Sequence, residues 1–342
     1  MANKINVATA DMLNSIRSEA SSAYQNAVPE ATPFNLTDVG NPILSYTSVA
    51  NEFLDALVNK IVGQILYRKM WNNPLSMLKK SAMPLGMDIE ETQANPATAS
   101  AYDGTDTGMA DLLKVQKPDV KAAWYRLNRT EKYKVTINND QLTNAFVSYA
   151  NLESFIAMIV DTLYNGATID EFKYTKQLIT DAYTANKINT ITVVNPTNSD
   201  TGRQFQVALR NLSLQFTFPS SSYNNYVKMG GTGARVTWSP IEDQVIIIRS
   251  DVAANIGVEV LSAAFNISYA DYLARQIIVD SFDTNSKVLA VLADEKAFQI
   301  REKLRQFATF YNAASLSWQY YYHCWDTFSL SPFHNCTALV TA

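Results

Sequence analysis

Two histidines and two cysteines near the C-terminus are the residue types best suited to metal binding or nucleophilic chemistry. His323–Cys324 and His334–x–Cys336 fall within 14 residues, and imidazole and thiolate are the ligands that zinc prefers. Paired zinc ligands normally have about two to five residues between them, however, whereas these pairs have none or one, and adjacent residues on a strand point to opposite faces. A Cys–His nucleophile would also need an orienting partner that the sequence does not supply. We therefore expect buried cysteines and hydrogen-bonded histidines, with no metal and no cofactor.

A glycine-rich cluster, GGTGAR at Gly230–Arg235, is the other segment that could bind a ligand. A phosphate-binding loop requires GxxxxGK[ST], and a dinucleotide fold requires GxGxxG between a strand and a helix. Neither pattern is complete, and the VTW that follows is typical of a strand. The cluster therefore predicts a flexible surface loop.

Paired carboxylates offer the last route to catalysis. Glu90–Glu91 and Glu242–Asp243 are adjacent pairs, so their side chains diverge along an extended chain. Paired-carboxylate catalysis is not excluded by this, but solvated faces are the expected state, and no GxSxG, HExxH or HxE…CxxC motif is present. We expect no enzyme.

The composition limits the class of protein further. The chain has 342 residues, a net charge of −4, and only two His and two Cys. It is long enough for roughly two domains and too poor in cysteine to be held by disulfides. A dedicated nucleic-acid binder would normally be basic, and there is neither an apolar run long enough to span a membrane nor a secretory signal. Charged residues make up 18%, below the usual ~25%, which fits either surfaces buried against other chains or a large core.

Residues 85–137 hold charge in an unusual arrangement. From Asp88 to Asp111 there are six acids and no Lys or Arg, and from Lys114 to Lys134 there are seven bases against two acids. Turn-forming residues separate the two limbs, and the return limb has the alternation of a strand. The pattern predicts an extended hairpin whose charges either dock against identical copies or pair with each other. The candidate inter-subunit contacts are Asp88, Glu90, Glu91, Lys114, Lys117, Lys121, Arg126 and Arg129.

Helical spacing dominates much of the N-terminal half. Residues 1–46 are not expected to be a core segment. They predict one helix from Asp11 to Ala27, followed by a segment broken by Pro and Gly that should lie over a surface. Residues 47–84 begin with a helix over Thr47–Met70, and residues 138–186 predict the longest helical stretch, with caps at Asn138 to Asp140 and a bend at Gly166.

The C-terminal half predicts an α/β unit and a hairpin. Residues 187–293 contain a strand, a helix capped by Ser199 to Thr201, a fully buried strand at Val245–Ile248, a helix opened by Ser250, and two more strands. Residues 294–342 predict an aromatic antiparallel hairpin and a last strand, although periodicity alone leaves Asp294–Tyr311 balanced between helix and strand.

This order of elements resembles the major capsid proteins of tailed bacteriophages with the Hong Kong 97 fold. Two segments, SDVAANIGVEVLSAAFNISYADYLARQIIVDSF and KVLAVLADEKAFQIREKLRQFATFYNAASLSWQYYYHCWDTFSLSPFHN, are similar to the head protein of small short-tailed phages (podoviruses) of Gram-positive hosts. The resemblance implies an α+β fold with an N-arm (1–46), a helix entering the body (47–84), an E-loop (85–137), a spine helix of the P-domain (138–186), an A-domain (187–293), and a P-domain hairpin with the C-terminal strand (294–342).

The function implied by the resemblance is structural. Pentamers and hexamers would form an icosahedral phage head around double-stranded DNA without sequence-specific binding. Portal and scaffolding proteins would be partners, no membrane would be involved, and the virion would assemble in the host cytoplasm. No covalent cross-link is expected, and the chain leaves no room for a C-terminal immunoglobulin-like domain. The alternatives are an encapsulin-like compartment and a nucleotide-binding enzyme using residues 187–293.

Overall fold

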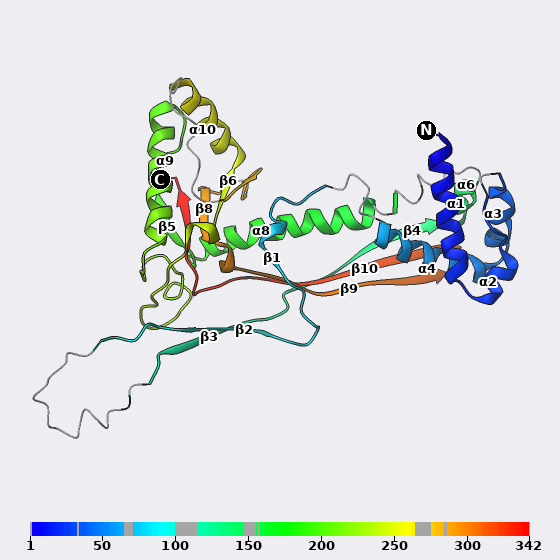
Figure 1. The fold of residues 1–342 in the computed structure, drawn as a ribbon, viewed down its shortest axis with the longest axis horizontal. Coiled ribbons are helices and arrows are strands. Elements are labelled where there is room, and N and C mark those ends of the chain that lie inside the picture. Colours follow the sequence, from blue (N-terminus) through cyan, green and yellow to red (C-terminus); the bar gives the residue numbers. More distant parts are fainter. Residues whose placement is uncertain are drawn as a thin grey trace, which may run out of the picture. The chain divides into compact units, whose positions relative to one another are not determined.

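The computed structural model of the chain is drawn in Figure 1 and divides into two compact units. Unit 1 contains residues 1–73, 130–171 and 304–325, and unit 2 contains residues 74–129, 172–303 and 326–342. The structure describes residues 2–32, 34–64, 71–99, 115, 117–146, 155, 158–159, 161–263, 275–283 and 286–341. Each unit takes chain segments from both halves of the sequence, so neither is a simple N-terminal or C-terminal domain.

Helices of the N-terminal segment build much of the core of unit 1. They are α1 (Ala2–Glu19), α2 (Ser22–Ala27), α3 (Leu36–Ser45) and α4 (Thr47–Gln64). Ile16, Ile43 and Phe53 are fully buried in one apolar cluster. The expectation that residues 1–46 are not a core segment is therefore wrong. The apolar stripe of α1 is buried within the chain, and Pro42 lies inside α3 rather than ending regular structure.

The long helical stretch after residue 138 is interrupted. Helix α6 (Asn139–Ala145) is capped by Asn138, one of the expected caps, in a reciprocal capping box with Gln141. A π-helical turn over Asp161–Asn165 leads directly into α8 (Gly166–Thr184). The bend predicted at Gly166 thus coincides with a change of helix type, a common cause of helix kinks.

A four-stranded sheet contains the C-terminal hairpin. Its order is β1-β9-β10-β4, formed by Lys79–Lys80, Phe298–Asn312, Ser317–Leu330 and Arg129–Asn138. The segment that periodicity could not assign is strand β9. In unit 1, alternate residues of β10 (Trp318, Tyr320, Tyr322 and Cys324) enter the same apolar cluster as the N-terminal helices, so burial of one sheet face favours the strand.

A mixed five-stranded sheet forms the centre of unit 2. Its order is β5-β11-β8-β6-β7, formed by Asn189–Thr192, Cys336–Val340, Val288–Asp294, Gln244–Arg249 and Arg275–Val279. Strand β11 pairs in parallel with β5 and antiparallel with β8. The last strand therefore shares a sheet with strands of residues 187–293 rather than with the hairpin that precedes it.

Helices cover both faces of this sheet, as the predicted apolar run on β6 requires. Ile246 and Ile248 pack with α9 (Ser199–Phe216) and α10 (Ser250–Ala263), which lie together beside the sheet in Figure 1. Val245 and Ile247 point to the opposite face, into a cluster that includes Ile179 of α8. Helix α9 is capped by Asn198, one residue before the predicted caps.

Candidate functional site

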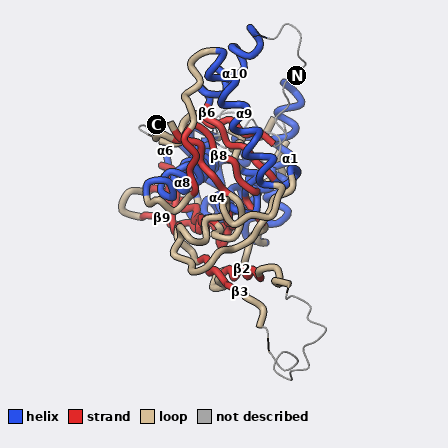
Figure 2. The backbone as a smooth tube through the Cα atoms, turned by 90° about the vertical axis from the view of Figure 1, so that its left-hand side faces the viewer, coloured by secondary structure: helices blue, strands red, loops and turns tan. Residues whose placement is uncertain are grey.

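Strands β2 (Ile89–Ala94) and β3 (Val120–Tyr125) form a hairpin with an exposed residue at every second position, and this hairpin is the candidate contact site. Figure 2 shows the two strands beside each other. The strands are antiparallel, with Ile89 opposite Tyr125 and Ala94 opposite Val120. The hairpin expected within residues 85–137 is thereby confirmed. Its return limb is not one strand, however, because residues 129–138 form β4 and pair with β10 in another sheet.

The two faces of the hairpin differ in polarity. Glu91, Gln93 and Tyr125 point inward and are buried or half-buried. The outward face is largely uncharged and exposed, and its cross-strand pairs are Glu90–Trp124, Thr92–Ala122 and Ala94–Val120. Trp124 is 60% exposed and Val120 is 51% exposed. Large apolar side chains this accessible mark a surface suited to contact with another chain.

The charged residues singled out in the sequence lie in different environments. Asp88 and Arg126 form an exposed ion pair of 3.1 Å, so the two limbs do pair at this point. Glu90 and Lys117 are exposed, and Lys121 is half-buried. Lys114 lies outside the described residues. Glu91 and Arg129 are engaged within the chain, as follows.

Glu91 is the centre of a polar cluster at the root of the hairpin. Its carboxylate accepts hydrogen bonds from the Tyr125 hydroxyl, from Ser331 Oγ at 2.7 Å, and from His334 Nε2 at 2.9 Å in the protonated-Nε2 tautomer. Burial alone would raise the pKa of Glu91, but the hydrogen bonds from His334, Ser331 and Tyr125 outweigh it and hold this pKa below its usual value. The cluster fastens β2 to the segment between β10 and β11.

Arg129 forms a buried ion pair at the start of β4. Its Nη1 lies 2.9 Å from Asp326 Oδ2, and both side chains are almost fully buried. The guanidinium also lies over the rings of Tyr174, at 5.0 Å, and Phe328, at 5.9 Å. Arg129 therefore has its charge partner and its stacking partners inside unit 2.

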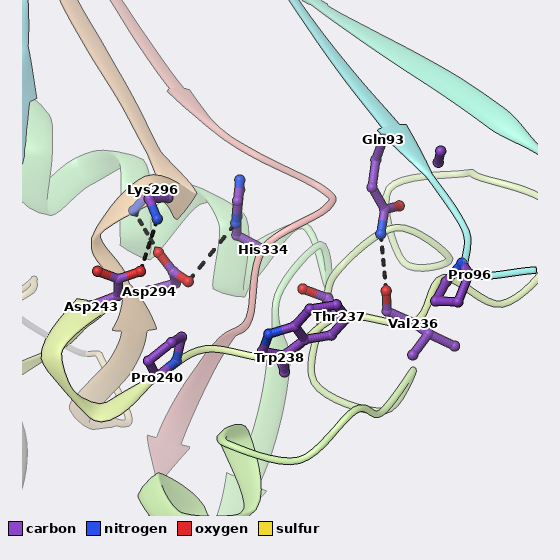
Figure 3. A pocket seen from close by; sticks show the side chains of 11 residues that line it. Gln93, Pro96, Val236, Thr237, Trp238, Pro240, Asp243, Asp294, Lys296 and His334 are labelled. Carbon is purple, nitrogen blue, oxygen red and sulfur yellow. Dashed lines mark hydrogen bonds and ion pairs between the residues drawn. The ribbon is translucent and has the colours of Figure 1, made fainter.

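A pocket of about 380 Å³ lies beside the polar cluster (Figure 3). It is lined by Gln93, Ala94, Pro96, Val236, Thr237, Trp238, Pro240, Asp243, Asp294, Lys296 and His334. Lys296 Nζ is 2.8 Å from Asp243, and His334 Nδ1 is 3.9 Å from Asp294. The Lys296 ammonium and the His334 imidazole thus each lie beside a carboxylate, and these contacts connect the segments that line the pocket.

The glycine-rich cluster and the two cysteines, which the sequence offered as candidates for chemistry, have their key side chains buried within the chain. Arg235 of the glycine-rich cluster is buried, and its guanidinium binds Asp119, so it does not present its charge to a phosphate. Cys324 and Cys336 are buried in different apolar clusters. Among the residues that the structure describes, no group of three His, Cys, Asp or Glu side chains could hold a metal ion, and no helix could cross a membrane.

Comparison with known proteins decides the family. Residues 13–340 match the family described as Phi29-like phage major capsid protein. The chain belongs to this family. It is 34% identical to the major capsid protein of Bacillus phage PZA over 97% of this chain and 72% of that one, and 28% identical to that of Streptococcus phage Cp-1 over 96% and 93%.

Solved structures agree with the fold of this major capsid protein. The capsid structure of Staphylococcus phage Andhra matches with a TM-score of 0.64 at 15% identity, covering 81% of this chain and 86% of that one. That of cyanophage P-SCSP1u matches with a TM-score of 0.53 at 10% identity, covering 82% and 91%. The α+β fold of the Hong Kong 97 type and the structural capsid role expected from the resemblance are confirmed. No finding supports the compartment or the nucleotide-binding enzyme.

Sequence reasoning found the hairpin but missed the residues that fix its root. Ser331 and His334 are 240 and 243 residues from Glu91 in the chain, and Asp326 is 197 residues from Arg129. No local pattern links such pairs. The sequence offered one signal for these contacts: Asp326 and His334 stand in otherwise aromatic, apolar segments, where a buried polar side chain needs a hydrogen-bond partner.

Proposed function

We propose that many copies of this chain assemble as pentamers and hexamers into an icosahedral phage head that encloses double-stranded DNA. The observation that carries the proposal is the family match over residues 13–340. A closed shell of identical chains requires repeated contacts that are each weak and together strong. The exposed apolar and charged surface of the hairpin supports one such contact.

In this proposal residues 85–137 are the E-loop and dock on an adjacent subunit. Residues 1–46 are the N-arm, residues 47–84 lead into the body, residues 138–186 are the spine of the P-domain, residues 187–293 are the A-domain, and residues 294–342 complete the P-domain. The exposed row of Val120, Ala122 and Trp124 supplies apolar contact area. Glu90, Lys117 and Lys121 supply charges that select the partner surface.

The remaining partners follow from the role of a shell. The net charge of −4 suits a container that encloses DNA without gripping it, because tight nucleic-acid binding depends on neutralising phosphates with cations. Portal and scaffolding proteins would contact the shell during assembly in the host cytoplasm. The role needs no catalytic group.

Charge reversal on the hairpin tests the docking. The triple variant Lys114→Glu/Lys117→Glu/Lys121→Glu should reduce the yield of closed shells seen by electron microscopy at least several-fold, because like charges would then meet across the contact. The matched control, with Arg at the same three positions, keeps the charge and should assemble as the unmodified chain does. Normal shells from the Glu variant would contradict the proposed docking.

A further inference from the structure

The end of the hairpin opposite its root, where Ala94 pairs with Val120, has a second attachment, to the segment that the sequence predicted to be a glycine-rich surface loop. Residues 234–236, here called the latch segment, follow the cluster of glycines and meet the ends of β2 and β3. Gly230 and Gly233 have positive φ angles of 94° and 89°, a backbone conformation that glycine adopts readily. These two turns bring the latch segment back toward the hairpin.

Side chains of the hairpin bind the backbone of the latch segment on both sides. Asn95 donates from Nδ2 to the carbonyl of Ala234 at 2.9 Å, and its Oδ1 accepts from the N–H of Val236 at 3.1 Å. Gln93 Nε2 donates to the carbonyl of Val236 at 3.1 Å. One amide side chain thus uses both its donor and its acceptor on this segment, as a neighbouring strand would.

Arg235 closes the contact from the opposite direction. Its Nη1 donates to the backbone carbonyl of Asp119 at 2.8 Å, and its Nη2 donates to Asp119 Oδ1 at 2.7 Å. The guanidinium is 1% exposed and lies 5.3 Å from the centre of the Tyr226 ring. A buried, bidentate guanidinium holds a defined geometry better than a solvated lysine would.

The latch segment itself is fixed to the five-stranded sheet. Asn224 Nδ2 donates to the carbonyl of Arg235 at 2.6 Å, and Asn225 Nδ2 donates to the carbonyl of Cys336 on β11 at 3.1 Å. The N–H of Cys336 donates in turn to the carbonyl of Tyr223 at 3.0 Å. The bonds that reach the hairpin therefore start from a platform connected to the core of unit 2.

A two-stranded hairpin is at best marginally stable in water, so its direction depends on what holds its two ends. We propose that the latch segment is a positioning device, in which Asn95 and Arg235 are the positioning residues that aim the outward face of the hairpin at the neighbouring copy. The positioning role rests on the proposed shell assembly, whereas the attachment of the hairpin does not. An open latch would leave a folded subunit whose hairpin samples many directions.

Hydrogen exchange and shell yield, measured on the same full-length variants, test the device. In Asn95→Ala and in Gln93→Ala/Asn95→Ala, amides of residues 89–94 and 120–125 should exchange at least tenfold faster than in the unmodified chain. Amides of β6 and β8 should stay within twofold, which shows that unit 2 is folded. Shell yield by electron microscopy should fall at least fivefold. Asn211→Ala makes the same amide-to-alanine change at an exposed position of α9, outside the hairpin and the latch segment; it is the matched control and should change neither readout.

Each other outcome is decisive. Hairpin exchange within twofold of the unmodified chain in both variants would overturn the latch. Faster exchange with an unchanged shell yield would overturn its positioning role. If the unmodified chain and Asn211→Ala also form no shells, with and without a scaffolding protein, the proposed assembly fails and the positioning role fails with it. The exchange rates still decide whether the latch holds the hairpin.

Discussion

The buried Arg129–Asp326 pair gives a quantitative test of whether Arg129 serves its own chain or a neighbour. Its two side chains are 4% and 2% exposed, and the charged atoms are 2.9 Å apart. Removing one partner from such a pair leaves an uncompensated buried charge and typically costs about 3–5 kcal/mol. The contact of the guanidinium with Tyr174 adds about 1 kcal/mol that only loss of the arginine removes.

A double-mutant cycle separates the pair from its surroundings. We expect Asp326→Asn to lower the free energy of unfolding by about 3 kcal/mol and Arg129→Met by about 4 kcal/mol. The double variant should cost much less than their sum, with a coupling energy of about 2–3 kcal/mol, because it removes both charges together. Urea titration followed by tryptophan fluorescence gives the unfolding free energies, and exchange of the amides of 326–330 locates the change.

Two results would refute this reasoning. Single-variant costs that add within about 0.5 kcal/mol would show that the two charges do not stabilise one another. Full stability of Arg129→Met together with loss of shells would show that Arg129 acts between subunits, as its position in the basic limb first suggested.

Three further predictions concern other parts of the chain. The pKa of Glu91 is lower in the folded chain than in the unfolded chain, so the ionised carboxylate stabilises the fold above its unfolded pKa, and this stabilisation is lost as pH falls through its folded pKa. In urea titrations between pH 6 and about 3, the free energy of unfolding should therefore fall with pH, and it should fall less steeply in Glu91→Gln. The same pH dependence in both proteins would contradict this prediction. Burial raises the pKa of Cys336 to about 12, so Ellman's reagent at about pH 8 should detect thiols only after denaturation, and rapid labelling of the folded chain would count against a buried thiol. Gly40→Ala would place its Cβ 2.9 Å from the Cβ of Phe146, so it should lower the free energy of unfolding by about 1–2 kcal/mol. A Cβ at Gly202 in α9 would meet no atom within 4 Å, so Gly202→Ala should raise the free energy of unfolding by up to about 1 kcal/mol. Similar effects of the two substitutions in urea titrations would refute the packing argument.

What could be predicted from the sequence depended on local signals. The apolar run of β6 predicted a strand buried on both faces, and each face now has its own cluster. Asn138 to Asp140 predicted a helix start because a capping side chain acts on neighbouring residues, and the structure shows that Asn138 is the cap. The alternation of residues 120–125 predicted a strand because its period reports one covered face.

The features that escaped prediction depend on distant partners. Residues 298–312 have no decisive periodicity, and pairing with β10 makes them a strand. Pro42 would normally end a helix, yet α3 continues through it because Val39 and Ile43 are buried together. At the candidate site, neither the partners of Glu91 nor the role of Arg235 could be read from neighbouring residues, since folding alone brings them together.

Electron microscopy of the purified full-length chain, with its mass distribution measured in solution, tests the central claim most directly. The account predicts closed shells whose surface resolves into clusters of five and six subunits, formed either by the chain alone or once a scaffolding protein is added. A population that stays at 38.1 kDa at high concentration, with and without scaffold, would contradict it.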